Sequence, residues 1–419
     1  MDKRYISLAR AKELKDQNEE YINYKKHIPF GMDENIINQY EKSKKILMDY
    51  FDINEDIWKD YKWQMANRIQ KIEILKLIIN LTPKEEEEIR NLSNKFRWMI
   101  TPYYACLIDP NDIFDPIRLN TIPTILEDSD TGESDPMDEA LTNPAGSITR
   151  RYPNRLIINV TNICPSYCRH CQRRRLFGEF DNHIYIEEIE ESIKYIKKNK
   201  EIRDVLITGG DALTLSDELL EYIIKNLRNI PHVEIIRIGT RSLVTLPYRI
   251  TDNLVNIFKK YEPIYLNTHF NHPKEITKDA QDAAFKLANN GVILGNQSVL
   301  LNGINNNKYI MRLLNEKLLT IKIKPYYLFH SKNIKGTSHF NTSFEDGIKI
   351  MKYLRGHTSG LCIPTYIVNA PHGLGKMPIP ASIKKIVGNY YYFENWEGKE
   401  IKYLNKPTLD FKKMYNDKS

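Results

Sequence analysis

Three of the five cysteines in this 419-residue chain fall within eight positions, at Cys164, Cys168 and Cys171. The spacing is C-x3-C-x2-C, and the apolar run just before it predicts a short buried strand, so the thiols should lie on a loop at a strand end. Three thiolates on one loop suit a 4Fe-4S cluster, because such a cluster keeps one iron open for a non-protein ligand. The alternatives are unconnected thiols or a zinc site, which would need a fourth ligand from His170 or a distant residue.

A second candidate for chemistry is Lys376, which ends the glycine-spaced stretch NAPHGLGK at 369–376. A Walker phosphate loop would need Gly where Ala370 stands and Ser or Thr where Met377 stands, so an NTPase is excluded. Glycines beside a lysine could instead let its amine form a Schiff base, a common way to hold pyridoxal phosphate. Most lysines lie on the surface, so this signal alone is weak.

Composition excludes several classes of protein. With 41% hydrophobic residues and no apolar run near 18 residues, we expect a soluble globular chain without a membrane span. The N-terminus is charged from its second residue, which predicts no secretory signal and a cytoplasmic location with no disulfide framework. The net charge of +7 is scattered rather than gathered in a basic stripe, so no nucleic acid is expected, whereas anionic small molecules remain plausible partners.

The chain before the cysteines divides into two parts. Residues 1–100 show apolar positions at helical spacing, notably over 40–51 and 66–82, and Pro83 followed by acids starts another helix, so we expect an N-terminal helical domain. Residues 101–146 are rich in proline and acids, which indicates a linker or surface wrap rather than a core.

After this linker, strand and helix patterns alternate. Helical patterns at 187–199, 216–229, 251–261 and 307–319 separate apolar runs at 155–160, 203–208, 233–238, 263–268, 291–295 and 321–328. This alternation predicts an α/β fold with a parallel sheet, either doubly wound or a full or partial barrel. In each case ligands bind at the carboxyl ends of the strands. Polar residues occur at those ends: the cysteines, Gly209-Gly210-Asp211, Thr240-Arg241, His269 and Gln297.

Several separated motifs occur in one consistent register between Tyr152 and Lys376. They are CPSYCRHCQRRR, DVLITGGDAL, HVEIIRIGTR, YLNTHFNHPKEIT, GNQSVLLNGIN and LRGHTSGLCIPTYIVNAPHGLGK. With these motifs the chain resembles the lysine 2,3-aminomutase family, radical S-adenosylmethionine enzymes that also use pyridoxal phosphate. The resemblance implies a partial (β/α)6 barrel over 147–376, followed by a C-terminal extension over 377–419.

The resemblance also implies roles by position. Cys164, Cys168 and Cys171 match the cluster ligands, and Lys376 matches the catalytic lysine that holds pyridoxal phosphate. The remaining matches are Arg151 and Arg155 for the phosphate, Arg173 for the substrate α-carboxylate, and Gly209, Gly210, Asp211, His269 and Gln297 for S-adenosylmethionine. The alternatives are that the glycines only form a turn and that His269 is structural; Arg174 and Arg175 are expected on the surface.

The chain departs from the lysine enzymes where they carry two aspartates for the distal ammonium of the substrate. Here the residues are Lys332 and Asn369. A substrate ammonium about 4 Å from Lys332 would meet roughly 4 kcal/mol of repulsion at an effective dielectric near 20, so an anionic side chain is favoured. Within the family the resemblance is closest to members that convert L-glutamate to β-glutamate by moving the amino group from C2 to C3.

Other assignments stay open at this point. They are an aminomutase for aspartate, glutamine or lysine, a non-enzymatic zinc-binding scaffold, and an arrangement in which Lys332 points to solvent and Asn369 caps a turn. No cysteine follows Cys362, and Asn307 stands where the lysine enzymes have a zinc ligand, so no zinc is expected. The resemblance further implies an isomerase with an amino-acid substrate, a one-electron reductant of the flavodoxin or ferredoxin type, and a homo-oligomer.

Overall fold

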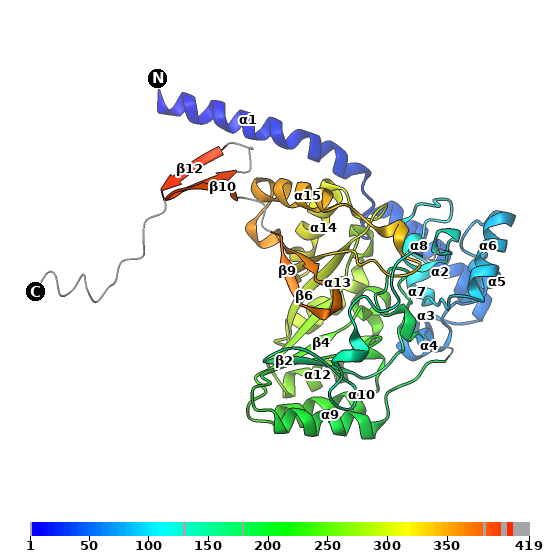
Figure 1. The fold of residues 1–419 in the computed structure, drawn as a ribbon. Helices are drawn as coiled ribbons and strands as arrows, with labels where there is room; N and C mark the ends of the chain where they lie inside the picture. The colour runs from blue at the N-terminus through cyan, green and yellow to red at the C-terminus, as the bar shows by residue number, and fades with distance from the viewer. Residues whose placement is uncertain (1, 129–130, 178–179, 380–382, 395–399, 405–419) are drawn as a thin grey trace, which may run out of the picture.

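The structure is a computed structural model that describes residues 2–128, 131–177, 180–379, 383–394 and 400–404. Its first hundred residues are mainly helical, as predicted, with α1 extending beyond the rest of the molecule in Figure 1. The helices are α1 (Lys3–Tyr24), α2 (Glu34–Phe51), α3 (Glu55–Trp58), α4 (Tyr61–Ala66), α5 (Ile72–Leu75) and α6 (Pro83–Ser93).

Two local predictions in this region have different outcomes. Helix α6 begins at Pro83, as expected, because Thr82 and Glu85 form a reciprocal capping box at its first turn. The long helix expected over 66–82 is wrong. Only α5 is helical there, and Ile69 instead pairs with Ile100 in an isolated β-bridge.

The sheet contains all six predicted strands in parallel. Within the described residues its strands follow the order of the sequence, and only the outer two, β1 and β9, run antiparallel to their neighbours. Strand β8, parallel to β7, was not predicted. The strands are β1 (Ile148–Tyr152), β2 (Arg155–Asn159), β3 (Asp204–Thr208), β4 (Ile235–Gly239), β5 (Ile264–Thr268), β6 (Ile293–Leu300), β7 (Lys324–His330), β8 (Thr365–Asn369) and β9 (Lys376–Pro378).

Helices follow each of the strands β2 to β7 and cover the outside of the curved sheet (Figure 1). The fold is therefore the predicted partial (β/α)6 barrel. The covering helices are α9 (Ile186–Lys198), α10 (Asp217–Arg228), α11 (Ser242–Thr245), α12 (Asp252–Lys260), α13 (Lys278–Ala288), α14 (Lys308–Thr320) and α15 (Phe344–His357).

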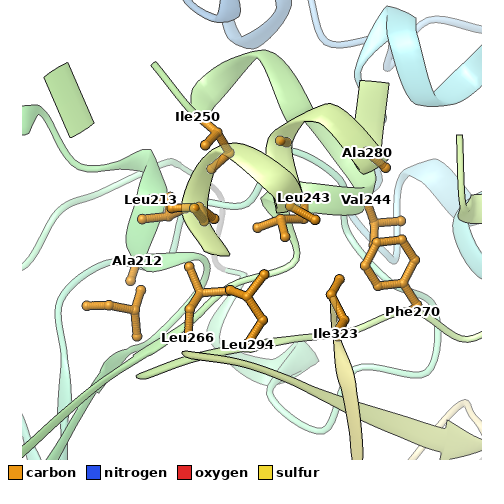
Figure 2. Packing of buried hydrophobic residues seen from close by; sticks show 14 of the residues in the cluster. Ala212, Leu213, Leu243, Val244, Ile250, Leu266, Phe270, Ala280, Leu294 and Ile323 are labelled. Atoms are coloured by element: carbon orange, nitrogen blue, oxygen red, sulfur yellow. The ribbon is translucent and has the colours of Figure 1, made fainter. Parts of the chain in front are cut away.

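Alternation along the strands separates the core from the interior of the barrel. In β3 to β5, side chains such as Ile207, Ile238 and Leu266 are fully buried. Their neighbours Arg237 and Asn267 are only partly buried and point to the other face of the sheet. Figure 2 shows two such strand residues, Leu266 and Leu294, opposite Leu243 of helix α11. The inner face thus stays free to line a cavity.

The segment 101–146 is not a surface wrap throughout, which corrects the sequence analysis. Residues 102–108 are buried, and helices α7 (Pro102–Ala105) and α8 (Pro116–Thr121) pack into the same hydrophobic cluster as the barrel strands and helices α2 to α6. One hydrophobic cluster therefore extends across the predicted limits of the helical domain, the linker and the barrel. The domain limits themselves remain predictions.

After β9 the chain forms a small separate sheet, β10 (Ile383–Val387), β11 (Tyr390–Glu394) and β12 (Glu400–Leu404), outside the barrel in Figure 1. Asn307 caps helix α14 by accepting from the Tyr309 amide at 2.8 Å. No helix in the described part of the chain has both the length and the apolarity needed to cross a membrane.

Candidate active site

A cavity of about 390 Å³ lies inside the curve of the sheet and reaches the carboxyl ends of its strands. Every site residue predicted from the sequence lines it. These residues come from strands β1, β2, β6, β8 and β9 and from the loops that follow β2, β3, β5 and β7, so the topology gathers residues far apart in the sequence.

The cysteine loop forms one wall of this cavity. The Arg241 guanidinium donates to Cys168 Sγ at 2.6 Å, and the Arg173 amide donates to Cys171 Sγ at 3.3 Å. Burial raises the pKa of Cys171 to about 11 and raises that of Cys164. Metal ligation needs thiolates, so loading this loop with metal would release protons.

The three thiols line the same cavity and are of the residue type that ligates a 4Fe-4S cluster. The described residues contain no group of three His, Cys, Asp or Glu side chains arranged to hold a single metal ion. A 4Fe-4S cluster presents separate iron atoms to its separate cysteines, so its ligands need not converge on one point.

The turn after β3 packs directly against the start of the cysteine loop. Gly209 has φ +135°, and a Cβ there would lie 2.4 Å from the Thr161 carbonyl oxygen. A Cβ on Gly210 would lie 2.3 Å from the Ile163 carbonyl oxygen. Both glycines are therefore required by close backbone approach, in addition to lining the cavity.

Asp211 is buried and its carboxylate is occupied by protein donors. It accepts from Thr240 Oγ1 at 2.6 Å and from the Arg241 amide at 2.7 Å, while burial raises its pKa. It thus ties the end of β3 to the end of β4. His269 Nε2 donates to the Asn271 side-chain oxygen at 3.0 Å, and burial followed by the nearby Arg241 charge lowers the pKa of His269 to about 3, so the imidazole is neutral.

Lys376 begins β9 and lies directly opposite Asn369 of β8 in the strand register. Its Nζ lies 5.0 Å from the Tyr327 ring centre. Burial, followed by the positive charges of Arg237 and Arg155, lowers the pKa of Lys376 to about 8. A lowered pKa raises the fraction of free amine, which is the form that makes a Schiff base.

Arginines near Lys376 provide a site for a phosphate. Arg151 Nε and Nη2 are buried without a hydrogen-bond partner among the described residues, although Nη2 forms a 3.5 Å ion pair with Glu139. Arg155 stacks on Tyr152 with 3.8 Å between guanidinium carbon and ring centre. Buried guanidinium donors without hydrogen bonds are costly unless a ligand satisfies them. Together with Lys376, these arginines fit pyridoxal phosphate.

The four arginines of the cysteine loop are paired with two buried acids from segment 101–146. Glu127 binds Arg169 and Arg174 (2.6 Å to Arg174), whereas Glu139 binds Arg173 at 3.1 Å and Arg175 at 3.3 Å. The expectation that Arg174 and Arg175 only decorate the surface is wrong, since their side chains are 10% and 23% exposed and ion-paired. Two acids of segment 101–146 therefore form ion pairs with the arginines of the cysteine loop.

Lys332 follows β7, lines the cavity and donates a hydrogen bond to the Gln172 side-chain oxygen. Burial lowers the pKa of Lys332 to about 7; Arg151, Arg173 and Lys376 act in the same direction, and Glu139 opposes them. Lys332 is thus not a solvent-facing lysine. Asn369 ends β8 within the same cavity, so the two residues that depart from the lysine enzymes face one space.

Comparison with known proteins decides the family. Residues 158–308 match the Radical SAM superfamily, and residues 351–408 match Lysine-2,3-aminomutase. Glutamate 2,3-aminomutase of Clostridioides difficile (strain 630) is 55% identical over 99% of this chain and 98% of its own length. L-lysine 2,3-aminomutase of Clostridium subterminale is 49% identical over 78% of this chain and 79% of its own. The chain belongs to the lysine 2,3-aminomutase family.

This aminomutase is an isomerase that uses a 4Fe-4S cluster, S-adenosylmethionine and pyridoxal phosphate. The alternative of a non-enzymatic zinc-binding scaffold, which the sequence left open, is therefore wrong. Among solved structures, Streptococcus suis SuiB bound to S-adenosylmethionine aligns with a TM-score of 0.40 and 14% identity, over 53% of this chain and 52% of that one.

Some residues of the aminomutase site were not found from its sequence. Arg237 of β4 lies beside Lys376 and is paired with Asp204 at 2.7 Å, and Glu139 and Gln172 line the cavity. Arg237 could have been found as a charged residue inside an apolar strand. Glu139 gave no such signal, because it stands in an acidic run typical of a linker.

Proposed function

We propose that this aminomutase acts on L-glutamate and moves its amino group from C2 to C3 to give β-glutamate. The observation that carries the proposal is Lys332, an ammonium on the cavity wall where lysine enzymes have an aspartate. A carboxylate at the end of the substrate side chain would be attracted there, whereas the ammonium of lysine would be repelled.

The charges of the cavity support an anionic substrate. Seven lysine and arginine side chains line it against only two acids, Glu139 and Asp211. Glutamate brings two carboxylates, and the phosphate of the cofactor brings further negative charge. We assign Arg173 to the α-carboxylate, Lys332 to the γ-carboxylate, and the Asn369 amide to a hydrogen bond with the latter.

The other residues place the cofactors. Bound together, the cluster and S-adenosylmethionine supply a radical that removes and returns a hydrogen atom, and pyridoxal phosphate stabilises the radical that rearranges. The cysteines hold the cluster, and Lys376 offers an amine to the cofactor aldehyde while Arg151 and Arg155 hold its phosphate. Gly209, Gly210, Asp211, His269 and Gln297 line the part assigned to S-adenosylmethionine.

An anaerobic assay of the loaded enzyme tests the proposal. Isotopically labelled glutamate, aspartate, glutamine and lysine are each supplied, and the position of nitrogen is read by NMR. We expect glutamate to give the highest ratio of kcat to KM, with lysine at least about a hundredfold lower because of the repulsion at Lys332. Equal or better use of another amino acid would overturn the assignment of glutamate.

The remaining proposals concern partners and location. We expect a flavodoxin or ferredoxin as electron donor, a homo-oligomer, a cytoplasmic enzyme, and no bound zinc or nucleic acid. Support for the first comes from the cluster chemistry, which needs one electron at a time. Residues 405–419, where a C-terminal zinc site would be sought, lie outside the described part of the chain.

A further inference from the structure

Glu139 contacts the cation that the proposed function assigns to the substrate α-carboxylate. Its two carboxylate oxygens accept from Arg173 Nε at 3.2 and 3.1 Å, and Oε1 also accepts from Nη2 at 3.1 Å. The side chain is 8% exposed. Burial acts against its charge, but Arg173, Arg151 and Arg175 outweigh burial and lower the pKa of Glu139 to about 2. It is therefore an anion at every working pH.

The geometry leaves one end of Arg173 available. A guanidinium carries five N–H donors, and Glu139 occupies the Nε side of the group while Nη1 donates to the Gly209 carbonyl at 3.3 Å. These bonds leave one unused hydrogen on Nη1 and one on Nη2 of Arg173. A planar carboxylate from a ligand can bind two such hydrogens side by side, so Glu139 and a substrate can share one arginine.

The turn that carries Glu139 is fixed by hydrogen bonds and ion pairs, within the turn and to Arg175 and His372. Asp135 accepts from the Glu139 amide at 2.8 Å and binds Arg175 at 2.9 Å. Asp138 contacts His372 Nδ1 at 2.9 Å, and the His372 amide donates to the Pro136 carbonyl at 3.1 Å. His372 belongs to the loop that leads to Lys376. The carboxylate is thus a fixed part of the cavity wall.

We propose that Glu139 is a positioning residue that holds Arg173 side-on, so that the free end of this guanidinium receives the α-carboxylate of the substrate. The inference rests on the proposed function, which assigns Arg173 to that carboxylate, and it applies to any α-amino acid substrate. Glu139 itself touches neither the reacting atoms nor, by this account, the substrate.

The test compares Glu139→Gln, which keeps size and removes charge, with Glu139→Asp, which keeps charge. For Glu139→Gln we expect KM for glutamate to rise about tenfold or more with kcat within about threefold, since substrate binding is lost rather than transition-state binding. Glu139→Asp should fall between this variant and wild type. Glutamate is also titrated into the enzyme loaded with pyridoxal phosphate but without reductant, and binding is followed by visible absorbance. The Kd for glutamate should rise about as much as KM does.

Glu127→Gln provides a matched control, because Glu127 is also a buried acid that pairs two arginines of the cysteine loop but does not line the cavity. Its KM should stay within about threefold of wild type. An unchanged KM and Kd in Glu139→Gln, or an equal rise in Glu127→Gln, would overturn the proposal. If Glu139→Gln does not fold, the KM of Glu139→Asp decides: a rise supports the proposal and no change overturns it.

Failure of the proposed function would be seen separately, as a wild-type enzyme that does not use glutamate. The variants are then measured with the amino acid that wild type does accept. With that amino acid, a KM rise confined to Glu139→Gln would support the inference about Arg173, and an unchanged KM would overturn it.

Discussion

At the scale of single residues, the charge of Lys332 is the most sensitive feature of the site. Its pKa is lowered to about 7 by burial and by Arg151, Arg173 and Lys376, against the opposing charge of Glu139. Below that pH Lys332 is an ammonium able to bind a carboxylate, and above it the neutral amine binds less well. Substrate affinity should therefore depend on pH within the physiological range.

We predict that kcat/KM for glutamate falls as pH rises through about 7, because this ratio reports groups of the free enzyme. In the complex the substrate carboxylate favours the ammonium, so kcat should fall at higher pH than kcat/KM. Lys332→Arg stays charged and should lack this part of the decline. Superimposable pH profiles of wild type and Lys332→Arg would show that Lys332 does not titrate in substrate binding.

Residue type and spacing predicted much of this site because some residues carry their chemistry visibly. Three close cysteines and a glycine-flanked lysine are rare enough to be noticed in one sequence, and the family resemblance supplied the rest. The pairing of Arg173 with Glu139 was out of reach, because it depends on how segment 101–146 folds across the cavity. An acidic run looks the same whether its carboxylates face water or buried arginines.

At the scale of elements, the turn after β3 and the cysteine loop form one packed unit. A Cβ on Gly210 would lie 2.3 Å from the carbonyl oxygen of Ile163, the residue before Cys164, so a side chain there would push against the start of the cysteine loop. This links a strand-end turn to the metal-binding loop through packing alone. It also gives the glycines a reason to be present that is independent of any ligand.

We predict that Gly210→Ala lowers the iron bound per chain after anaerobic reconstitution and destabilises the fold by roughly 1–3 kcal/mol, the usual cost of overpacking. Gly360→Ala is the control, because a Cβ there has nothing within 4 Å. Iron content and thermal unfolding are compared in the two variants. Full iron binding in Gly210→Ala with an unchanged midpoint would show that the loop does not depend on this contact.

The elements themselves were predictable where pattern and packing agree. Runs rich in isoleucine, leucine and valine became the strands β2 to β7, since a strand covered by helices needs an apolar outer face. The helix expected over 66–82 failed because the bridge between Ile69 and Ile100 takes that backbone out of helical geometry. Strand β8 was not predicted because it is only 5 residues long, TYIVN, and comes directly before the glycine-rich loop.

At the scale of the whole molecule, the cavity is built by parts of the chain that are distant in sequence. Segment 101–146 contributes Glu139, strand β4 contributes Arg237, the loop after β7 contributes Lys332, and strand β9 contributes Lys376. The result is a strongly cationic interior. Its charge suits a phosphate-bearing cofactor with a dicarboxylate substrate, and it opposes a substrate with a second ammonium.

The central claim is that Lys332 selects the carboxylate of glutamate. The direct measurement is kcat/KM for glutamate and for lysine in three proteins: wild type, the single variant Lys332→Asp, and the double variant that combines Lys332→Asp with Asn369→Asp. In Lys332→Asp a carboxylate would face the substrate carboxylate, so glutamate use should fall by a factor corresponding to about 2–5 kcal/mol. The double variant restores the acidic pair of the lysine enzymes and should gain measurable turnover of lysine. Glutamate use within about threefold of wild type in Lys332→Asp, a change of less than about 1 kcal/mol, would contradict the claim.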